Sequence, residues 1–184
     1  MIKAVIFDCF GVLIGDAYMV IRKKYPELSP RITGLGVESN LGRITSLERR
    51  ERTVEMLNEI GARGQVVLRE AIDGITRNTE LLGEIKRLRE KFKTGLLSNA
   101  GEGFWRRFSE QELKEYFDTV VVSYQVGLVK PDPRIFELTA DRLGVEMDEC
   151  VFVDDDASNV RAAESCGMRG IVYEWGMDVA KSLA

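Results

Sequence analysis

Four polar clusters in the sequence lie where short apolar runs end, and their residue types could do chemistry together. They are Asp8, Ser98-Asn99, Lys130-Pro131 and Asp154-Asp155. Each cluster alone has an ordinary structural explanation, as a helix cap, a first-turn acid or a solvated turn. That explanation does not account for four such clusters at corresponding places in the chain. We therefore interpret them together as a candidate functional site.

The charges of this candidate site predict a bound metal ion. Asp8, Asp154 and Asp155 carry three negative charges, whereas Lys130 supplies one positive charge. A hard divalent cation such as Mg²⁺ relieves this repulsion, because it prefers one or two carboxylates together with substrate oxygens and water. With such an ion bound, Asp8 could attack phosphorus as a carboxylate nucleophile, while Lys130 and Ser98 hold the non-bridging oxygens.

The sequence contains no histidine, and this excludes several classes of site. Among its 184 residues, 30 are Asp or Glu and 26 are Lys or Arg, which gives a formal net charge of −4. Without imidazole, Ser-His-Asp triads, histidine general bases and His-ligated metals are all excluded. An acidic chain is also a poor match for nucleic acid, which binds basic surfaces. We expect a small-molecule substrate and no nucleic-acid partner.

The cysteines and the apolar runs indicate a protein of the reducing cytoplasm. Cys9, Cys150 and Cys166 cannot all pair, and no two of them have the C-x-x-C spacing. We interpret them as small buried hydrophobic residues. No apolar stretch reaches the roughly 18 residues of a membrane span. The N-terminal apolar run is interrupted by Asp8 and lacks a signal-peptide cleavage site, so we expect no membrane association.

Five short apolar runs without polar alternation predict strands that are buried on both faces of a parallel sheet. They are residues 4–7, 95–97, 119–122, 151–153 and 170–173. Helical patterns lie between them, at 81–92, 131–143 and 157–166. This alternation predicts an α/β fold with a doubly wound parallel sheet. Ligands of such sheets bind at the carboxyl ends of the strands, where the four polar clusters lie.

Residues 16–76 break the alternation and predict an inserted helical cap. The segment has no strand-like apolar run, and Thr45 and Glu48 have the spacing of a capping box that begins a helix reaching Ile60. A further short helix is predicted at 65–75. We expect residues 1–15 and 77–184 to form the α/β core domain, with the insertion covering the strand ends.

The charged run at 48–52 within this insertion has two interpretations. It could form an anion-binding or RNA-binding patch, or it could be a solvated helix face with a Glu48–Arg52 ion pair. The spacing of four residues between opposite charges favours the solvated face. The insertion otherwise offers four candidates for anion contacts, namely Lys23, Lys24, Arg43 and Arg49.

The polar clusters and the apolar residues before them resemble the motifs of the haloacid dehalogenase (HAD) superfamily of phosphotransferases and hydrolases. The matching segments are Val5-Ile6-Phe7-Asp8-Cys9-Phe10-Gly11-Val12-Leu13, Leu96-Leu97-Ser98-Asn99, Lys130-Pro131-Asp132-Pro133 and Val151-Phe152-Val153-Asp154-Asp155. The spacing of the last motif to Asn159 most resembles sugar-phosphate phosphatases and the phosphatase domain of soluble epoxide hydrolases. The resemblance implies a Rossmann-type core and a hydrolase that acts on a small phosphorylated substrate.

The resemblance also implies a role for each motif residue. Asp8 would be the nucleophile and form an aspartyl-phosphate, with Ser98 and Lys130 as phosphate binders. Asn99 follows Ser98 at a strand end and is expected to face the substrate. The implied Mg²⁺ ligands are Asp8, the backbone carbonyl of Phe10, Asp155 and, directly or through water, Asp154.

Phe10 is the departure from the family pattern. Most phosphatases of the family have an aspartate at this position, which protonates the leaving group and then activates water. Phenylalanine does neither, which removes a contribution of roughly 10²–10⁴-fold. Three hypotheses follow: a phosphatase for substrates with good leaving groups, a dehalogenase of 2-haloacids, whose relatives also place an aromatic residue here, or a weakened protein that binds a phosphorylated ligand. The Asp154-Asp155 pair would repel a haloacid carboxylate, which favours the phosphatase.

Overall fold

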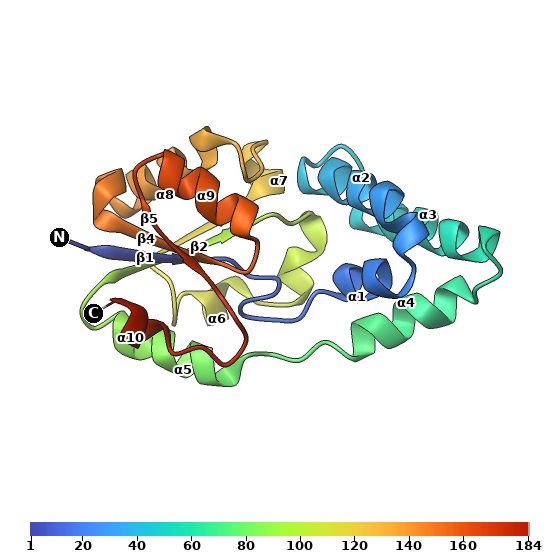
Figure 1. Cartoon of the computed structure of the whole chain (residues 1–184), viewed down its shortest axis with the longest axis horizontal. Helices are drawn as coiled ribbons and strands as arrows, with labels where there is room; N and C mark the ends of the chain where they lie inside the picture. Colours follow the sequence, from blue (N-terminus) through green and yellow to red (C-terminus); the bar gives the residue numbers. More distant parts are fainter. Residues whose placement is uncertain (184) are drawn as a thin grey trace.

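A five-stranded parallel sheet forms the centre of the computed structural model, which describes residues 1–183 (Figure 1). The strand order is β3-β2-β1-β4-β5. The strands are β1 (Ala4–Phe7), β2 (Lys93–Ser98), β3 (Thr119–Val122), β4 (Cys150–Asp154) and β5 (Arg169–Val172). All four pairings are parallel, so the predicted strands and the α/β fold class are confirmed.

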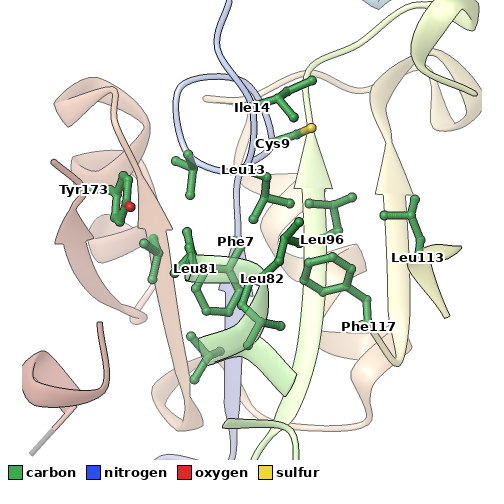
Figure 2. Close-up of a cluster of buried hydrophobic side chains, with 14 of the residues drawn as sticks. Phe7, Cys9, Leu13, Ile14, Leu81, Leu82, Leu96, Leu113, Phe117 and Tyr173 are labelled. Carbon is green, nitrogen blue, oxygen red and sulfur yellow. The ribbon is translucent and has the colours of Figure 1, made fainter. Parts of the chain in front are cut away.

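Helices cover both faces of the sheet, as Figure 1 shows. Those of the sheet layers are α5 (Thr79–Leu88), α6 (Glu110–Leu113), α7 (Ser123–Val126), α8 (Pro133–Leu143), α9 (Ala157–Ser165) and α10 (Val179–Leu183). Alternate residues of β1 point into different clusters of buried side chains, because successive side chains of a strand face opposite ways. Phe7 packs with Leu81 of α5 (Figure 2), whereas Ile6 packs with Phe136 of α8.

Four helices form an insertion between β1 and α5, and we call it the helical insertion. It comprises α1 (Ala17–Lys24), α2 (Ser29–Asn40), α3 (Ser46–Glu59) and α4 (Gly64–Asp73), with a short 3₁₀ turn at Pro26–Leu28. Its buried side chains, among them Ile21, Ile32 and Leu57, form a cluster separate from the two beside the sheet. Figure 1 shows these helices beyond the carboxyl end of β1.

The two connections of the insertion to the sheet run side by side. Ile14 pairs with Arg77 in an antiparallel bridge, and the Gly15 N–H donates to the Thr76 carbonyl at 3.1 Å. Both ends of the insertion are therefore fixed at one place beside β1.

Most helix boundaries follow the predicted signals. The capping box of α3 is complete, because Thr45 Oγ1 accepts from the Glu48 N–H and the Glu48 carboxylate accepts from the Thr45 N–H. One prediction was wrong: α5 ends at Leu88 rather than near Phe92. β2 begins at Lys93, so the intervening residues form the turn that reverses the chain, with the Phe92 N–H donating to the Leu88 carbonyl.

The three cysteines are free thiols. Cys9 and Cys150 are buried, and Cys166 is half-buried. Among residues 1–183, no helix has both the length and the apolar character that crossing a membrane requires.

Candidate active site

Three of the predicted site residues form a buried ion-pair cluster at the carboxyl ends of the strands. The Lys130 ammonium donates to Asp8 Oδ1 at 2.5 Å, to Asp154 Oδ2 at 2.7 Å and to the Leu97 carbonyl at 3.1 Å. Lys130 and Asp154 are 4% and 1% exposed, so this charge network is shielded from water. All three N–H donors of Lys130 are engaged, and they fix the orientation of the Asp8 carboxylate.

β1 and β4 place the two carboxylates of this cluster side by side. The Asp8 N–H donates to the Val153 carbonyl at 2.8 Å, which extends the pairing of the two strands by one residue. Asp154 ends β4, and its Oδ1 accepts from the Asp156 N–H at 2.8 Å. Asn159 of α9 donates to Asp154 Oδ2 at 3.1 Å. Asp154 is thus held by three donors, while Asp8 accepts from Lys130.

Asn99 positions Lys130 from the end of β2. Its Oδ1 accepts from the Lys130 N–H at 2.8 Å, and its Nδ2 donates to the Lys130 carbonyl at 2.9 Å. Asn99 also lines the cavity above the strand ends. Both ends of its amide are nevertheless bonded to protein backbone, so the structure gives Asn99 a positioning role that we did not predict.

Asp155 is the freer of the two adjacent acids, and Gly11 makes room for it. The backbone of Gly11 has φ +95°, a conformation that favours glycine, and a Cβ there would overlap the Asp155 carboxylate. The loop after β1 therefore requires glycine on two counts. The glycine itself is visible in the sequence, directly after Phe10. Only the structure shows that the Asp155 carboxylate occupies the space that a Cβ on Gly11 would need.

The carboxylates of Asp8, Asp154 and Asp155 lie close enough to share a cation, because one oxygen of each lies within 4.8 Å of the others. Burial raises the pKa of Asp8 to about 7, with Lys130 opposing the shift and Asp154 adding to it. Burial and the neighbouring Asp154 raise the pKa of Asp155 to about 6. One lysine therefore does not neutralise the cluster, and the donor set fits a hard divalent cation.

Ser98 and Phe10 complete the predicted set. Ser98 is fully buried at the end of β2, and its hydroxyl has no hydrogen-bond partner among the described residues. Phe10 is partly buried against the core beneath it and lines the cavity. Cys9, next to Asp8, is a packing residue, because its side chain is fully buried in the core cluster around Phe7 and Leu81; this burial also raises the pKa of its thiol.

A cavity of about 860 Å³ separates the strand ends from the helical insertion. Its floor contains Asp8, Asp154 and Asp155, and arginines of the insertion and of the segment after β2 line other parts of it. Of the four candidate anion contacts in the insertion, Arg49 lines the cavity, whereas Lys23, Lys24 and Arg43 are not among its lining residues.

The predicted solvated face at 48–52 is correct for residues 50–52, which are exposed, and was wrong in two respects. Arg49 is half-buried and lines the cavity, and the exposed Arg50 lines it as well. No Glu48–Arg52 ion pair occurs within residues 1–183, because Glu48 accepts from the N–H and the hydroxyl of Thr45 at 2.7 and 2.9 Å. The capping box uses the carboxylate that the predicted pair would need.

The fold and the site together define an α/β protein with an acidic, metal-competent centre at the carboxyl ends of its strands. The chain belongs to the haloacid dehalogenase-like hydrolases, whose family model matches residues 2–167. The predicted family and hydrolase class are thereby confirmed.

Individual relatives include phosphatases. The chain is 29% identical over 181 residues to a phosphorylated carbohydrates phosphatase of Thermotoga maritima, covering 92% of this chain and 83% of that protein. It is 42% identical over 72 residues to bifunctional epoxide hydrolase 2 of Rattus norvegicus, covering 39% of this chain and 12% of the relative. The match thus spans about an eighth of the epoxide hydrolase.

Solved structures share the whole fold. A HAD family enzyme of Bacteroides thetaiotaomicron, solved in complex with magnesium and inorganic phosphate, superposes with a TM-score of 0.77 at 24% identity, and all of both chains is covered. At this identity the likeness shows the fold, helical insertion included.

Proposed function

We propose that the protein is a Mg²⁺-dependent phosphatase that hydrolyses a small phosphomonoester, such as a sugar phosphate, with Asp8 as the nucleophile. The observation that carries this proposal is the Asp8 carboxylate, held by Lys130 at 2.5 Å beside two further acids on the floor of a cavity. Supporting it, the Thermotoga relative is a phosphatase of phosphorylated carbohydrates, and the Bacteroides structure contains magnesium and phosphate.

The metal site of this proposal consists of Asp8, the Phe10 backbone carbonyl and Asp155, with Asp154 behind them. A Mg²⁺ ion bound there would supply positive charge to the phosphoryl oxygens and lower the repulsion between the phosphate and the carboxylates. Asp154 already accepts from Lys130 Nζ, Asn159 Nδ2 and the Asp156 N–H, which favours contact through water.

Asp8 would carry the covalent step. One carboxylate oxygen forms a bond to phosphorus, and the bond from phosphorus to the ester oxygen breaks with its electron pair going to the leaving alcohol. Lys130 keeps the attacking carboxylate oriented. Ser98, which the family pattern assigns to a phosphoryl oxygen, is fully buried at the end of β2 and is not among the residues that line the cavity, so its hydroxyl would have to turn toward the cavity to reach that oxygen. Water then attacks the aspartyl-phosphate, which releases phosphate and restores Asp8.

Proton transfer in this scheme lacks the usual aspartate, because Phe10 stands at its position. The leaving oxygen must take its proton from water or from the substrate. Substrates whose leaving group is stable as an anion, such as sugar 1-phosphates, therefore suit the site best.

Phe10 also supports a second candidate function. In this alternative, the protein keeps the fold and binds a phosphorylated ligand but has little catalytic activity. A 2-haloacid dehalogenase fits less well. The substrate carboxylate of a haloacid would meet three acids and one lysine, which repel it when no metal is bound.

The deciding experiment measures phosphate release from a panel of phosphomonoesters, including p-nitrophenyl phosphate, with and without Mg²⁺. We expect Mg²⁺-dependent release that Asp8→Asn lowers by roughly 10³-fold or more, because the nucleophile is lost without a change of size. Asp141→Asn, an exposed position on α8, is the matched control and should keep full activity. Halide release from 2-chloropropionate without metal would support the dehalogenase. Phosphate-ester stabilisation against heat, without turnover, would support the binding protein.

A further inference from the structure

Arg49 of α3 is a half-buried arginine whose Nε is fully buried and which has no anionic partner among residues 1–183. Its Nε has no hydrogen-bond partner, and within residues 1–183 it forms no ion pair. Burial lowers the pKa of Arg49, and the nearby Tyr18 and Asp16 oppose that shift. An arginine that loses water without gaining an acceptor costs stability. Such an arrangement is typical of a side chain whose partner is a ligand.

The side chains and backbone around Arg49 hold its guanidinium in place. The guanidinium carbon lies 3.6 Å from the centre of the Tyr18 ring of α1, a stacking contact that arginine makes readily. α2 passes so close that a Cβ at Gly36 would lie 3.2 Å from Nη2. Three helices of the insertion therefore build this position, and the guanidinium is held before any ligand arrives.

The rest of this wall also offers unpartnered polar atoms. Ser39, near the end of α2, is 1% exposed, and its hydroxyl has no partner among the described residues. Ser39 and Arg49 line the same cavity. Arg22, by contrast, is engaged, because it lies 3.5 Å from Asp16 and donates to Thr33. Arg50, Arg106 and Arg107 also line the cavity, but of the arginines there only Arg49 has a buried and unpartnered nitrogen among the described residues.

The cavity has two chemically different regions. The floor holds three carboxylates and the metal-competent centre, whereas Arg49 presents positive charge from the helical insertion. A neutral sugar alcohol would leave the Arg49 donors without an anionic acceptor. A carboxylate or a second phosphate would accept from them and match their charge.

We propose that Arg49 binds a second anionic group, a carboxylate or a phosphate, at the end of the substrate remote from the ester that is cleaved. This inference rests on the proposed phosphatase function. It narrows the substrate class to phosphomonoesters with an anionic tail.

The test compares matched substrates in matched variants. Phosphorylated hydroxy acids of increasing chain length are each paired with the alkyl phosphate of the same length, and diol bisphosphates are paired with the diol monophosphates. The readout is the ratio of the two kcat/KM values in each pair. We expect the protein to prefer the anionic tail at one chain length, and Arg49→Met to lower that preference by roughly 10- to 100-fold.

Arg52→Met is the control, since it removes the same charge from an exposed position of α3 that does not line the cavity. It should leave the preference unchanged. Arg49→Lys keeps the charge but loses the planar fork, and should keep part of the preference. It also replaces Arg49→Met if that variant does not fold. If the phosphorylated hydroxy acids show the larger ratio of kcat/KM values, the tail is a carboxylate. If the diol bisphosphates show the larger ratio, the tail is a phosphate.

Failure of the phosphatase proposal can be told apart from failure of this one. If no ester in the panel is hydrolysed, calorimetry of the same ligand pairs reports binding alone. A tail-dependent gain in affinity that Arg49→Met removes would still support the anion site. Equal preference, or equal affinity, in the unsubstituted protein and in Arg49→Met would overturn it.

Discussion

Phe10 determines which half of the reaction we expect to be slow. In the proposed mechanism, the formation of the aspartyl-phosphate needs the carboxylate of Asp8, which Lys130 holds at 2.5 Å. Its hydrolysis needs a water molecule that loses a proton, and Phe10 cannot accept one. With a good leaving group, the covalent intermediate should accumulate.

Phe10→Asp should therefore raise kcat, by up to roughly 10²-fold, and should abolish a burst of alcohol release in rapid-mixing experiments with p-nitrophenyl phosphate. Phe10→Asn is the matched control, because it has the size of aspartate without its basicity. A rate increase of the same size in both variants would show that relief of crowding, not proton transfer, is responsible.

Single residues also show what the sequence could and could not predict. Asp8 and Asp154 converge because they lie at the carboxyl ends of the neighbouring strands β1 and β4, as predicted. Lys130 does not directly follow a strand, because α7 lies between β3 and the loop that carries it. The role of Asn99 depends on a hydrogen bond to the backbone of Lys130, a partner far along the chain. The inward direction of Arg49 depends on its packing against α1 and α2. Neither contact has a local sequence signal.

At the scale of elements, the loop between β1 and the helical insertion shapes the proposed metal site. Gly11→Ala would place a Cβ in the space of the Asp155 carboxylate and would strain the backbone at φ +95°. We expect the Mg²⁺ concentration for half-maximal activity to rise at least roughly tenfold, because a displaced ligand binds the ion less well.

Gly127→Ala is the matched control for Gly11→Ala. Gly127 also has a positive φ, of 67°, but nothing lies within 4 Å of the place that its added methyl group would take, so only backbone strain is added. It should lower stability slightly and leave the Mg²⁺ requirement unchanged. An unchanged requirement in Gly11→Ala would argue against Asp155 as a ligand.

Asp118, just before β3, joins three elements and should make stability depend on pH. It accepts from the Thr94 N–H of β2 at 2.8 Å and from Arg89, which follows α5, at 2.8 Å. Burial alone would raise the pKa of Asp118, but these two donors outweigh it and hold the pKa below the ordinary value of 3.8. The folded protein thus releases this proton more readily than the unfolded chain, so the stabilisation is complete above that value and is lost as the pH falls through the folded pKa.

Asp118→Asn should lower the free energy of unfolding in urea by about 1 kcal/mol at neutral pH, since the site is partly open to solvent. The difference from the unsubstituted protein should shrink as the pH falls below about 4. Asp141→Asn on α8 is the control, and should show neither effect. A difference that stayed constant down to acid pH would show that packing, and not the charge, stabilises this junction.

The elements were predictable to different degrees for a physical reason. The central strands β1, β2 and β4 are buried on both faces over nearly all of their length, so their apolar runs are continuous. The edge strands β3 and β5 are partly exposed, and their apolar runs still predicted them to within one residue. The capping box fixed the start of α3 in the same way. The end of α5 was missed because the turn after Leu88 is set by where β2 must begin, which is a tertiary requirement.

At the scale of the whole molecule, the contact between the helical insertion and the strand-end side of the sheet sets the size of the cavity. Ser123 beside β3 donates to the Asn40 carbonyl of α2 at 2.7 Å, and the Gly103 N–H donates to Ser46 Oγ of α3 at 2.9 Å. These bonds hold the wall that carries Arg49 opposite the wall that carries Asp8. The cavity therefore keeps its size only if the two parts approach this closely.

Gly101, in the segment after β2, lies where this segment approaches the helical insertion closely, and a substitution there can test the contact. A Cβ there would lie 2.5 Å from Ser39 Oγ and 3.0 Å from the Ser39 carbonyl, so Gly101→Ala should push the insertion away from the sheet. We expect kcat/KM for the best anionic-tailed substrate to fall roughly tenfold, because misplacement of bound groups by a fraction of an ångström to one ångström is costly. Both fixed connections at Ile14 and Arg77 remain, so the fold itself should persist.

Gly34→Ala on α2 is the matched control, because nothing lies within 4 Å of the added methyl group. It should raise stability by roughly 0.5–1 kcal/mol, as expected for a glycine replaced inside a helix, and leave kcat/KM unchanged. If Gly101→Ala lowers kcat/KM for p-nitrophenyl phosphate as much as for the anionic-tailed substrate, the approach of the two walls serves the cleaved ester alone. A loss of kcat/KM that is confined to the anionic-tailed substrate would show that the distance between the two walls determines which substrate length is accepted.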